Sequence, residues 1–115
     1  MNKNNVAIAE AYYTAMGEKN VADMGQYLHP DVQFISPLTE MKGKEAVLEA
    51  VKRLIAFFKT LTIRATFGSG NQAMLAYDLD FPSPMGNCPA AALLTFQEGL
   101  ISKIQLFFDG RPFDK

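Results

Sequence analysis

The sequence holds few of the residues from which metal sites and disulfides are built. Its 115 residues include one cysteine, Cys88, and one histidine, His29. A single cysteine excludes an intramolecular disulfide and any zinc site made of several cysteines, and no cluster of His, Asp and Glu replaces it. We therefore expect no metal and no cofactor. A single free thiol is typical of a reducing compartment, which predicts a cytoplasmic protein.

An excess of charge and long apolar runs are also missing. Eleven basic and twelve acidic residues leave a net charge of -1, without a stripe of Lys and Arg. Proteins that bind nucleic acid usually present a basic patch, so nucleic acid is not an expected partner. No apolar run is long enough to span a membrane, and Glu10 interrupts the N-terminal stretch too early for a signal peptide. A membrane is not expected as a partner either.

The size and composition are those of one ordinary domain. The chain is 49% hydrophobic and 20% charged, and it shows no repeat, no low-complexity segment and no linker. A domain of this length buries roughly two-thirds of its unfolded surface, so it needs no disulfide or metal for stability. We expect a single domain over residues 1–115.

The first half of the sequence predicts helices. Apolar side chains recur at helical spacing over residues 4–18, 21–28 and 44–58. Glu49 and Arg53 are four residues apart on the polar side of the third segment. We expect them to form a weak surface ion pair, worth a few tenths of a kcal/mol.

The second half predicts strands. Apolar and polar side chains alternate over residues 61–67 and 75–81, and strand patterns continue over 90–97 and 100–108. An additional short strand is expected at 32–36. Each alternating strand should have one buried and one solvated face. Helices followed by a run of antiparallel strands are the pattern of an α+β domain.

One stretch near the N-terminus resembles a known fold. Residues 12–37, YYTAMGEKNVADMGQYLHPDVQFISP, read as a helix, a short helix and a strand that ends in Ser-Pro. This order resembles the opening of the fold shared by nuclear transport factor 2, ketosteroid isomerase and SnoaL-like polyketide cyclases, and residues 92–109 align as well. The resemblance implies a cone-shaped, cystatin-like α+β barrel. About three helices in the N-terminal half would pack on a curved, mostly antiparallel sheet.

Against the isomerase pattern, the chain keeps one of three catalytic positions. Tyr12 aligns with the tyrosine that donates to the oxyanion, whereas Ser36 replaces the aspartate base and Ala92 replaces the second acid. Serine without a partner is a poor general base, and alanine donates nothing. Some cyclases of this fold carry an acid–base aspartate on the last strand, which makes Asp109 the remaining catalytic candidate. Strict alternation would point Asp109 outward, so whether the protein is an enzyme stays open.

The resemblance also implies a pocket inside the cone. The side chains expected to contact a ligand there are Tyr12, Phe34, Ser36, Tyr77, Phe96 and Phe108. A cone with few polar groups suits a small, mostly apolar molecule, and binding of such a molecule is the leading hypothesis. One alternative is an isomerase, cyclase or dehydratase that uses Tyr12 and Asp109. Another is a dimeric interaction module whose core is filled by side chains.

Apolar residues also occur on the face of the last strands that should be wet. Ala91, Leu93 and Phe107 have this outward parity. Apolar side chains on an outer face indicate a covered surface. In the fold that the chain resembles, this face often pairs with a second subunit. We therefore expect a homodimer with two-fold symmetry.

Overall fold

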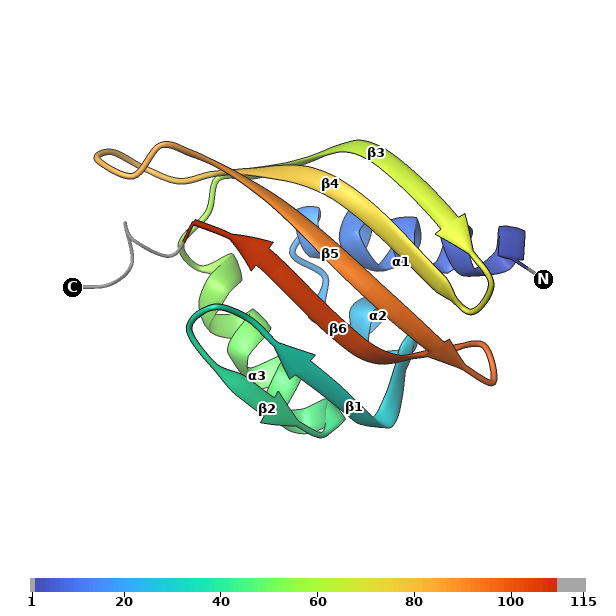
Figure 1. Cartoon of the computed structure of the whole chain (residues 1–115). Helices are drawn as coiled ribbons and strands as arrows, with labels where there is room; N and C mark the ends of the chain where they lie inside the picture. The colour runs from blue at the N-terminus through green and yellow to red at the C-terminus, as the bar shows by residue number, and fades with distance from the viewer. Residues whose placement is uncertain (1, 110–115) are drawn as a thin grey trace.

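Three helices pack on one face of a curved six-stranded sheet in the computed structural model, which describes residues 2–109 (Figure 1). The helices are α1 (Asn2–Gly17), α2 (Val21–Gly25) and α3 (Lys44–Ile55). The strands are β1 (Leu28–Ile35), β2 (Glu40–Lys42), β3 (Thr60–Ser69), β4 (Gln72–Asp80), β5 (Asn87–Gln97) and β6 (Leu100–Phe108). Within this part of the chain, no helix has the length and apolar character needed to cross a membrane.

The sheet has the strand order β2-β1-β6-β5-β4-β3. All neighbouring strands are antiparallel except β1 and β6, which run parallel. Helix α1 packs on β3 and β4, and α3 packs on β1. The expected α+β class, with three helices on a curved, mostly antiparallel sheet, is confirmed. The sheet is open rather than a closed barrel, because β2 and β3 are edge strands that do not pair with each other.

The boundary between α2 and β1 differs from the sequence prediction. Helix α2 ends at Gly25, and Leu28 already pairs with β6. Pairing with a distant strand therefore overrides the local helical spacing. Pro30 has no N–H to give to the sheet, and it lies where the register shifts after Leu28. The ring of His29 has a local role there, because its Nδ1 accepts the backbone N–H of Asp31 at 3.0 Å.

Two further elements differ from the prediction. The sequence pattern does not indicate β2, because three residues are too few for an alternation to be visible. Helix α3 ends at Ile55 rather than at residue 58. Phe58 still enters the core, since it is only 1% exposed. The side chain of Lys19 holds this segment against the end of α1 by donating to the carbonyl of Phe58 at 2.7 Å.

The core lies between the helices and the inner face of the sheet. Fully buried side chains come from every layer, and the largest are Tyr12, Tyr13, Met24, Leu28, Phe58, Leu75, Leu94, Ile101 and Ile104. The inner-facing positions of β4 and β5 alternate as the sequence predicts, with Leu75 and Leu94 completely buried. Burial of this apolar surface is the main source of stability for a domain without disulfides.

Candidate functional site

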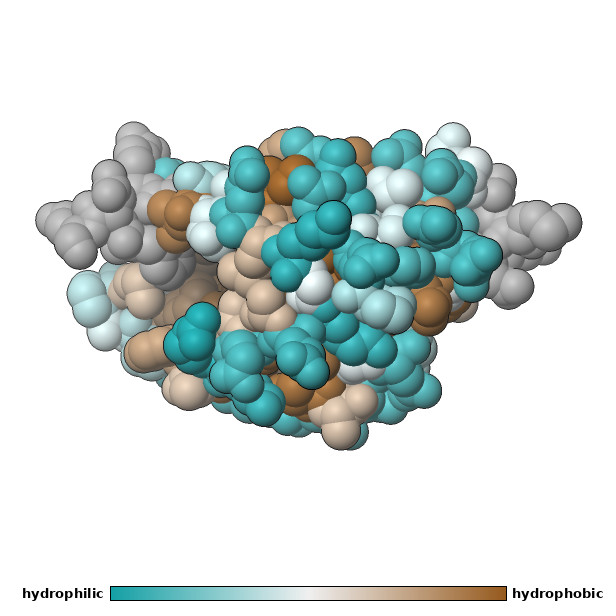
Figure 2. Space-filling view, turned by 90° about the horizontal axis from the view of Figure 1, so that it is seen from below, coloured by the Kyte–Doolittle hydropathy of each residue, from teal (hydrophilic) through white to brown (hydrophobic). Residues whose placement is uncertain are grey.

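A cavity of about 340 Å³ opens between the helices and the inner face of the sheet. Its aromatic lining residues are Tyr12, Tyr13, Phe34, Phe57, Tyr77, Phe81 and Phe108. Most of the others are aliphatic, and they come from α1, from α3, from the turn between β1 and β2, and from strands β2, β4, β5 and β6. Figure 2 shows a recess with hydrophobic walls on the left of the view from below. The volume lies within the range of roughly 300–1,000 Å³ that is usual for small-molecule sites.

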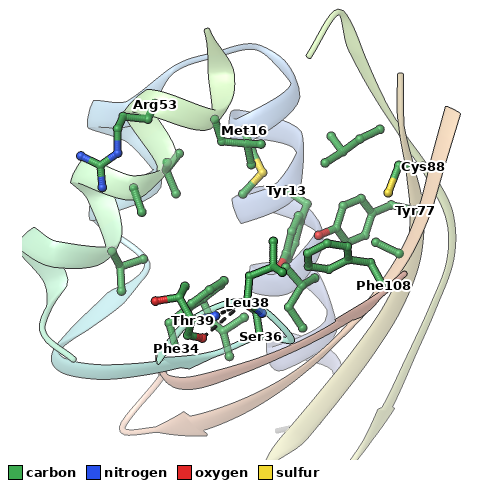
Figure 3. A pocket seen from close by; sticks show the side chains of 18 of the residues that line it. Tyr13, Met16, Phe34, Ser36, Leu38, Thr39, Arg53, Tyr77, Cys88 and Phe108 are labelled. Atoms are coloured by element: carbon green, nitrogen blue, oxygen red, sulfur yellow. Dashed lines mark hydrogen bonds between the residues drawn. The ribbon is translucent and has the colours of Figure 1, made fainter. Parts of the chain in front are cut away.

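Five of the six side chains that the sequence proposes as ligand contacts line this cavity. They are Tyr12, Phe34, Ser36, Tyr77 and Phe108. They come from four different elements: α1, the end of β1, β4 and β6. Figure 3 shows four of these residues around the cavity: Phe34, Ser36, Tyr77 and Phe108. The fold therefore brings these positions together, while contact with a ligand stays a prediction.

Phe96 does not line the cavity. It is buried in the core, and it pairs with Ile101 close to the turn between β5 and β6. The residues of β5 that do line the cavity are Cys88 and Ala90, which lie at the opposite end of this strand. Six residues along a strand separate Ala90 from Phe96, which corresponds to about 20 Å. Alternation predicts the face on which a side chain lies, but it does not predict the position of the cavity along the strand.

Tyr13, Cys88 and Arg53 are three of the lining residues that the sequence prediction does not name. Tyr13 shares the apolar side of α1 with Tyr12, so helical spacing was a usable signal for it. Cys88 falls in a proline-rich stretch that resembles a loop but forms the start of β5. No sequence signal indicates Arg53, because it lies on the polar side of α3. Its place in the cavity lining follows from the tertiary structure alone.

Three phenol rings form a cluster at the inner wall of the cavity. The ring centres of Tyr12 and Tyr13 are 5.0 Å apart with an interplanar angle of 85°. Those of Tyr13 and Tyr77 are 4.8 Å apart at 39°. Burial raises the pKa of each phenol above its usual value near 10. All three hydroxyls therefore keep their protons at neutral pH, which suits them to donate hydrogen bonds and not to act as bases.

The hydroxyl of Ser36 is engaged in a local turn. Its Oγ accepts the backbone N–H groups of Leu38 and Thr39, both at 3.2 Å, and donates to the carbonyl of Thr39 at 3.2 Å. A serine hydroxyl has one proton to donate and two lone pairs to accept with, so these bonds use its full capacity. Dashed lines in Figure 3 mark this turn. The geometry of this turn gives Ser36 a structural role. This role does not depend on whether Ser36 also contacts a ligand.

The groups able to perform nucleophilic or acid–base chemistry are few. Burial, and then the negative charges of Asp109 and Asp78, raise the pKa of the Cys88 thiol. A protonated thiol is a weak nucleophile. Asp109 is exposed at the end of β6 and is not among the residues that line the cavity. Within residues 2–109, no group of three His, Cys, Asp or Glu side chains lies together as a metal site would require.

Arg53 is the only charged residue among the described residues that line the cavity. The pair with Glu49 that the sequence predicts does not form. Glu49 accepts instead from Lys52, at 3.4 Å. Both partners are available to Glu49 on a helix surface, since residues three and four positions apart are neighbours there. Among the described residues, Arg53 forms no ion pair, and its exposed side chain lies at the mouth of the cavity.

Comparisons with known proteins identify one family and many similar folds. The profile of the SnoaL-like domain family matches residues 9–104. A search of curated proteins finds no significant match. Among solved structures, a protein from Kribbella flavida is 23% identical with a TM-score of 0.88, over 95% of this chain and 89% of that one.

Two other solved structures are similar over most of their length. A nuclear transport factor 2-like protein from Cytophaga hutchinsonii is 20% identical, with a TM-score of 0.81, over 94% of this chain and 92% of that one. A protein with a ketosteroid isomerase-like fold from Catenulispora acidiphila, in complex with trimethylamine, is also 20% identical. Its TM-score is 0.75, over 89% of this chain and 85% of that one. At such identities the similarity establishes the fold and not the ligand.

Proposed function

The chain belongs to the SnoaL-like domain family, and we propose that its cavity binds a small, mostly apolar molecule. The observation that carries the proposal is the open volume of about 340 Å³ with aromatic and aliphatic walls. An apolar cavity of about 150 Å³ is already enough to bind benzene. Apolar ligand surface contributes about 25 cal/mol for each Å² removed from water. The walls supply that surface. The side chains of Tyr13 and Tyr77 are hydrogen-bonded to each other, which leaves Tyr12 and one hydroxyl of this pair as donors that would orient a polar substituent.

Binding is preferred to the two alternatives for separate reasons. An isomerase or cyclase needs a group that moves a proton at the substrate. Ser36 occupies the base position with its hydroxyl fully engaged, and Asp109 is exposed outside the cavity lining. An interaction module with a filled core would have no open cavity. The trimethylamine complex of the Catenulispora protein supports the proposal at the level of the fold, because that relative holds a small molecule.

A naphthalene probe tests the proposal. The sequence contains no tryptophan, so the emission of naphthalene-2-carboxamide can be followed without interference from indole. Burial of roughly 200 Å² of the probe predicts a Kd on the order of 0.1 mM. We expect this affinity to stay constant between pH 6 and 9, because the pKa values of Tyr12, Tyr13 and Tyr77 are raised and the phenols do not titrate there. Absence of binding up to the solubility limit of the probe would refute the proposal.

We also propose that two copies of the chain associate through the outer face of the sheet. Two neighbouring rows of residues cross this face: Phe67, Met74 and Leu93 form one, and Ala65, Ala76, Ala91 and Phe107 form the other. Phe67 is 67% exposed and Phe107 is 44% exposed. Such a patch costs free energy in water and indicates a covered surface.

The charges beside these two rows are compatible with a second copy as the partner. Lys103 follows the row of Phe67 toward one end of the strands, and the ion pair between Asp78 and Arg64, at 3.2 Å, follows the row of Phe107 toward the other. A two-fold axis parallel to the rows places Lys103 of one copy toward this neutral pair of the other, and it brings the two apolar rows together. This arrangement sets no like charges against each other, and it uses the same surface on both copies, as an isologous dimer requires.

Replacement of Phe107 by aspartate is expected to weaken this dimer at least about tenfold, because the new carboxylate would be buried in the apolar interface. Sedimentation velocity at micromolar concentration measures the effect. Phe57→Asp is the matched control, since Phe57 is 63% exposed but lies at the cavity and not on the outer face. A stable dimer should have a dissociation constant below about 100 µM. A parent protein that still sediments as a monomer at this concentration would contradict the proposal.

A further inference from the structure

We propose that the natural ligand of the cavity is an amphipathic acid, with an apolar body inside the cavity and a carboxylate or similar anionic group that pairs with Arg53. This inference names the ligand class for the binding function proposed above, and it rests on that function. The argument depends on the charge at the cavity mouth, on the pairing of the neighbouring side chains and on the exposed apolar residues around the mouth.

The charge of the cavity lining that residues 2–109 provide is entirely positive. Arg53 is the only charged side chain among the described residues that line it, and no carboxylate is among them. Figure 3 shows Arg53 on α3, on the other side of the view from Tyr77 and Cys88. The guanidinium is ionised at every physiological pH and holds carboxylates through two parallel N–H donors. A ligand anion at this mouth meets a cation that no carboxylate in the described part of the lining neutralises.

The neighbouring side chains leave this guanidinium available. Glu49 is one turn before Arg53 on α3 and is the nearest acidic partner along the helix. It is engaged by Lys52 instead, at 3.4 Å. Among the described residues, Arg53 has no salt-bridge partner. Binding a ligand anion therefore requires no existing ion pair to be broken.

Exposed apolar side chains at the mouth indicate where the ligand body would emerge. Leu38 is 51% exposed and Phe57 is 63% exposed, although both line the cavity. Phe57 follows the end of α3, four residues after Arg53. A molecule that fills the cavity and ends at Arg53 would cover part of both side chains. Its charged group would stay partly hydrated at the surface, which avoids the cost of burying an anion in the apolar interior.

The phenols deeper in the cavity do not compete for the anion. Burial raises the pKa of Tyr12 and Tyr77, so both are neutral at physiological pH. An anion placed among them would lose its hydration and gain only neutral donors, whereas at Arg53 it keeps water and gains a cation. This difference sets the orientation of the ligand, with the apolar end inward. It also predicts that a cationic amine binds less well than a neutral molecule of the same shape.

Three naphthalene probes of nearly equal size test the inference: naphthalene-2-carboxylate, naphthalene-2-carboxamide and 2-naphthylmethylammonium. We expect the parent protein at low salt to prefer the carboxylate over the carboxamide by about fivefold, which is the strength of a good exposed ion pair. The preference should decrease as salt is added. The ammonium probe should bind more weakly than the carboxamide.

Variants assign the preference to one residue. In Arg53→Gln, the ratio of the affinity for the carboxylate to the affinity for the carboxamide should fall to about one. Lys59→Gln is the matched control, because it removes the same charge from an exposed residue outside the cavity lining, and it should keep the ratio. Arg53→Lys should keep part of it, since a point charge replaces the planar fork.

The possible failures are distinguishable. If the carboxamide binds but the carboxylate binds no better, or if Arg53→Gln keeps the parent ratio, the inference is wrong and the proposed function stands. If the ammonium probe binds best, the site selects cations and the inference is also wrong. If none of the three probes binds, the cavity is not a binding site for apolar molecules and both proposals fail.

Discussion

Replacement of Ala90 by tryptophan is expected to close the cavity and to remove most ligand binding, while the domain stays folded. Ala90 lines the cavity, and its neighbours on the adjacent strands, Tyr77 and Phe108, line it as well. An indole at this position would enter open volume and would not displace packed side chains. If it takes the place of roughly 150 Å² of probe contact, about 4 kcal/mol of binding free energy is lost. From a parent Kd on the order of 0.1 mM, a loss of several hundredfold puts the affinity beyond detection, so isothermal titration calorimetry with naphthalene-2-carboxamide should show no binding.

The adjacent residue provides the control for this experiment. Ala91 is on the same strand but faces the outer side of the sheet, so Ala91→Trp adds the same side chain away from the cavity. We expect it to leave the affinity for the probe within about a factor of two, which corresponds to less than 0.5 kcal/mol. Parent-like binding by Ala90→Trp would show that the probe binds elsewhere. Equal loss of binding in both variants would assign the effect to the strand and not to the cavity.

The second large effect concerns stability. Replacement of Tyr13 by alanine should lower the free energy of unfolding by about 3–5 kcal/mol, the usual cost of deleting a large buried aromatic ring. Tyr13 is 2% exposed, and its ring packs between those of Tyr12 and Tyr77. The substitution removes both ring contacts and enlarges a cavity that is already present. Urea denaturation at pH 7 measures the change, which is a large part of the total stability of a small domain.

Two variants separate the contribution of the ring from other effects on α1. Thr14→Ala changes the exposed neighbour and should alter the free energy of unfolding by less than about 0.5 kcal/mol. Tyr13→Phe keeps the ring and removes the hydroxyl, so it should cost much less than Tyr13→Ala. A loss below about 1 kcal/mol in Tyr13→Ala would mean that the phenol cluster contributes little to the core.

The sequence was sufficient for those parts of the fold that depend on local periodicity. Helical spacing predicts α1 and α3, and alternation predicts the strands that face the core with residues such as Leu75 and Leu94. Its errors occur where a distant partner decides the structure. Residues 26–28 are not helical, because Leu28 pairs with β6. Helical spacing equally permits Glu49 to pair with Lys52 or with Arg53, and the structure contains the pair with Lys52.

The candidate site was predicted only in part, because spacing within one element does not tell where the packed elements leave a cavity. Phe34 and Tyr77 have the correct strand parity, Tyr12 lies on the apolar side of α1, and all three also lie where the cavity opens. Phe96 has the correct parity but lies at the other end. Arg53 lies on the polar side of α3. Its side chain reaches the cavity because this part of the helix forms the edge of the cavity. Parity is a property of one element, whereas position at the cavity depends on how several elements pack.

By itself, the sequence determined the α+β class of this chain, the absence of an intramolecular disulfide, an apolar interior and the absence of two of the three groups that an isomerase of this fold uses. The first three properties follow from residue type and from spacing within single elements, and the last follows from the resemblance to the isomerase. Only the tertiary structure decided which apolar side chains fill the core and which surround open space, and that Arg53 stands at the mouth of that space. An open cavity arises from the distances between elements that are far apart in the chain, and no local pattern records those distances.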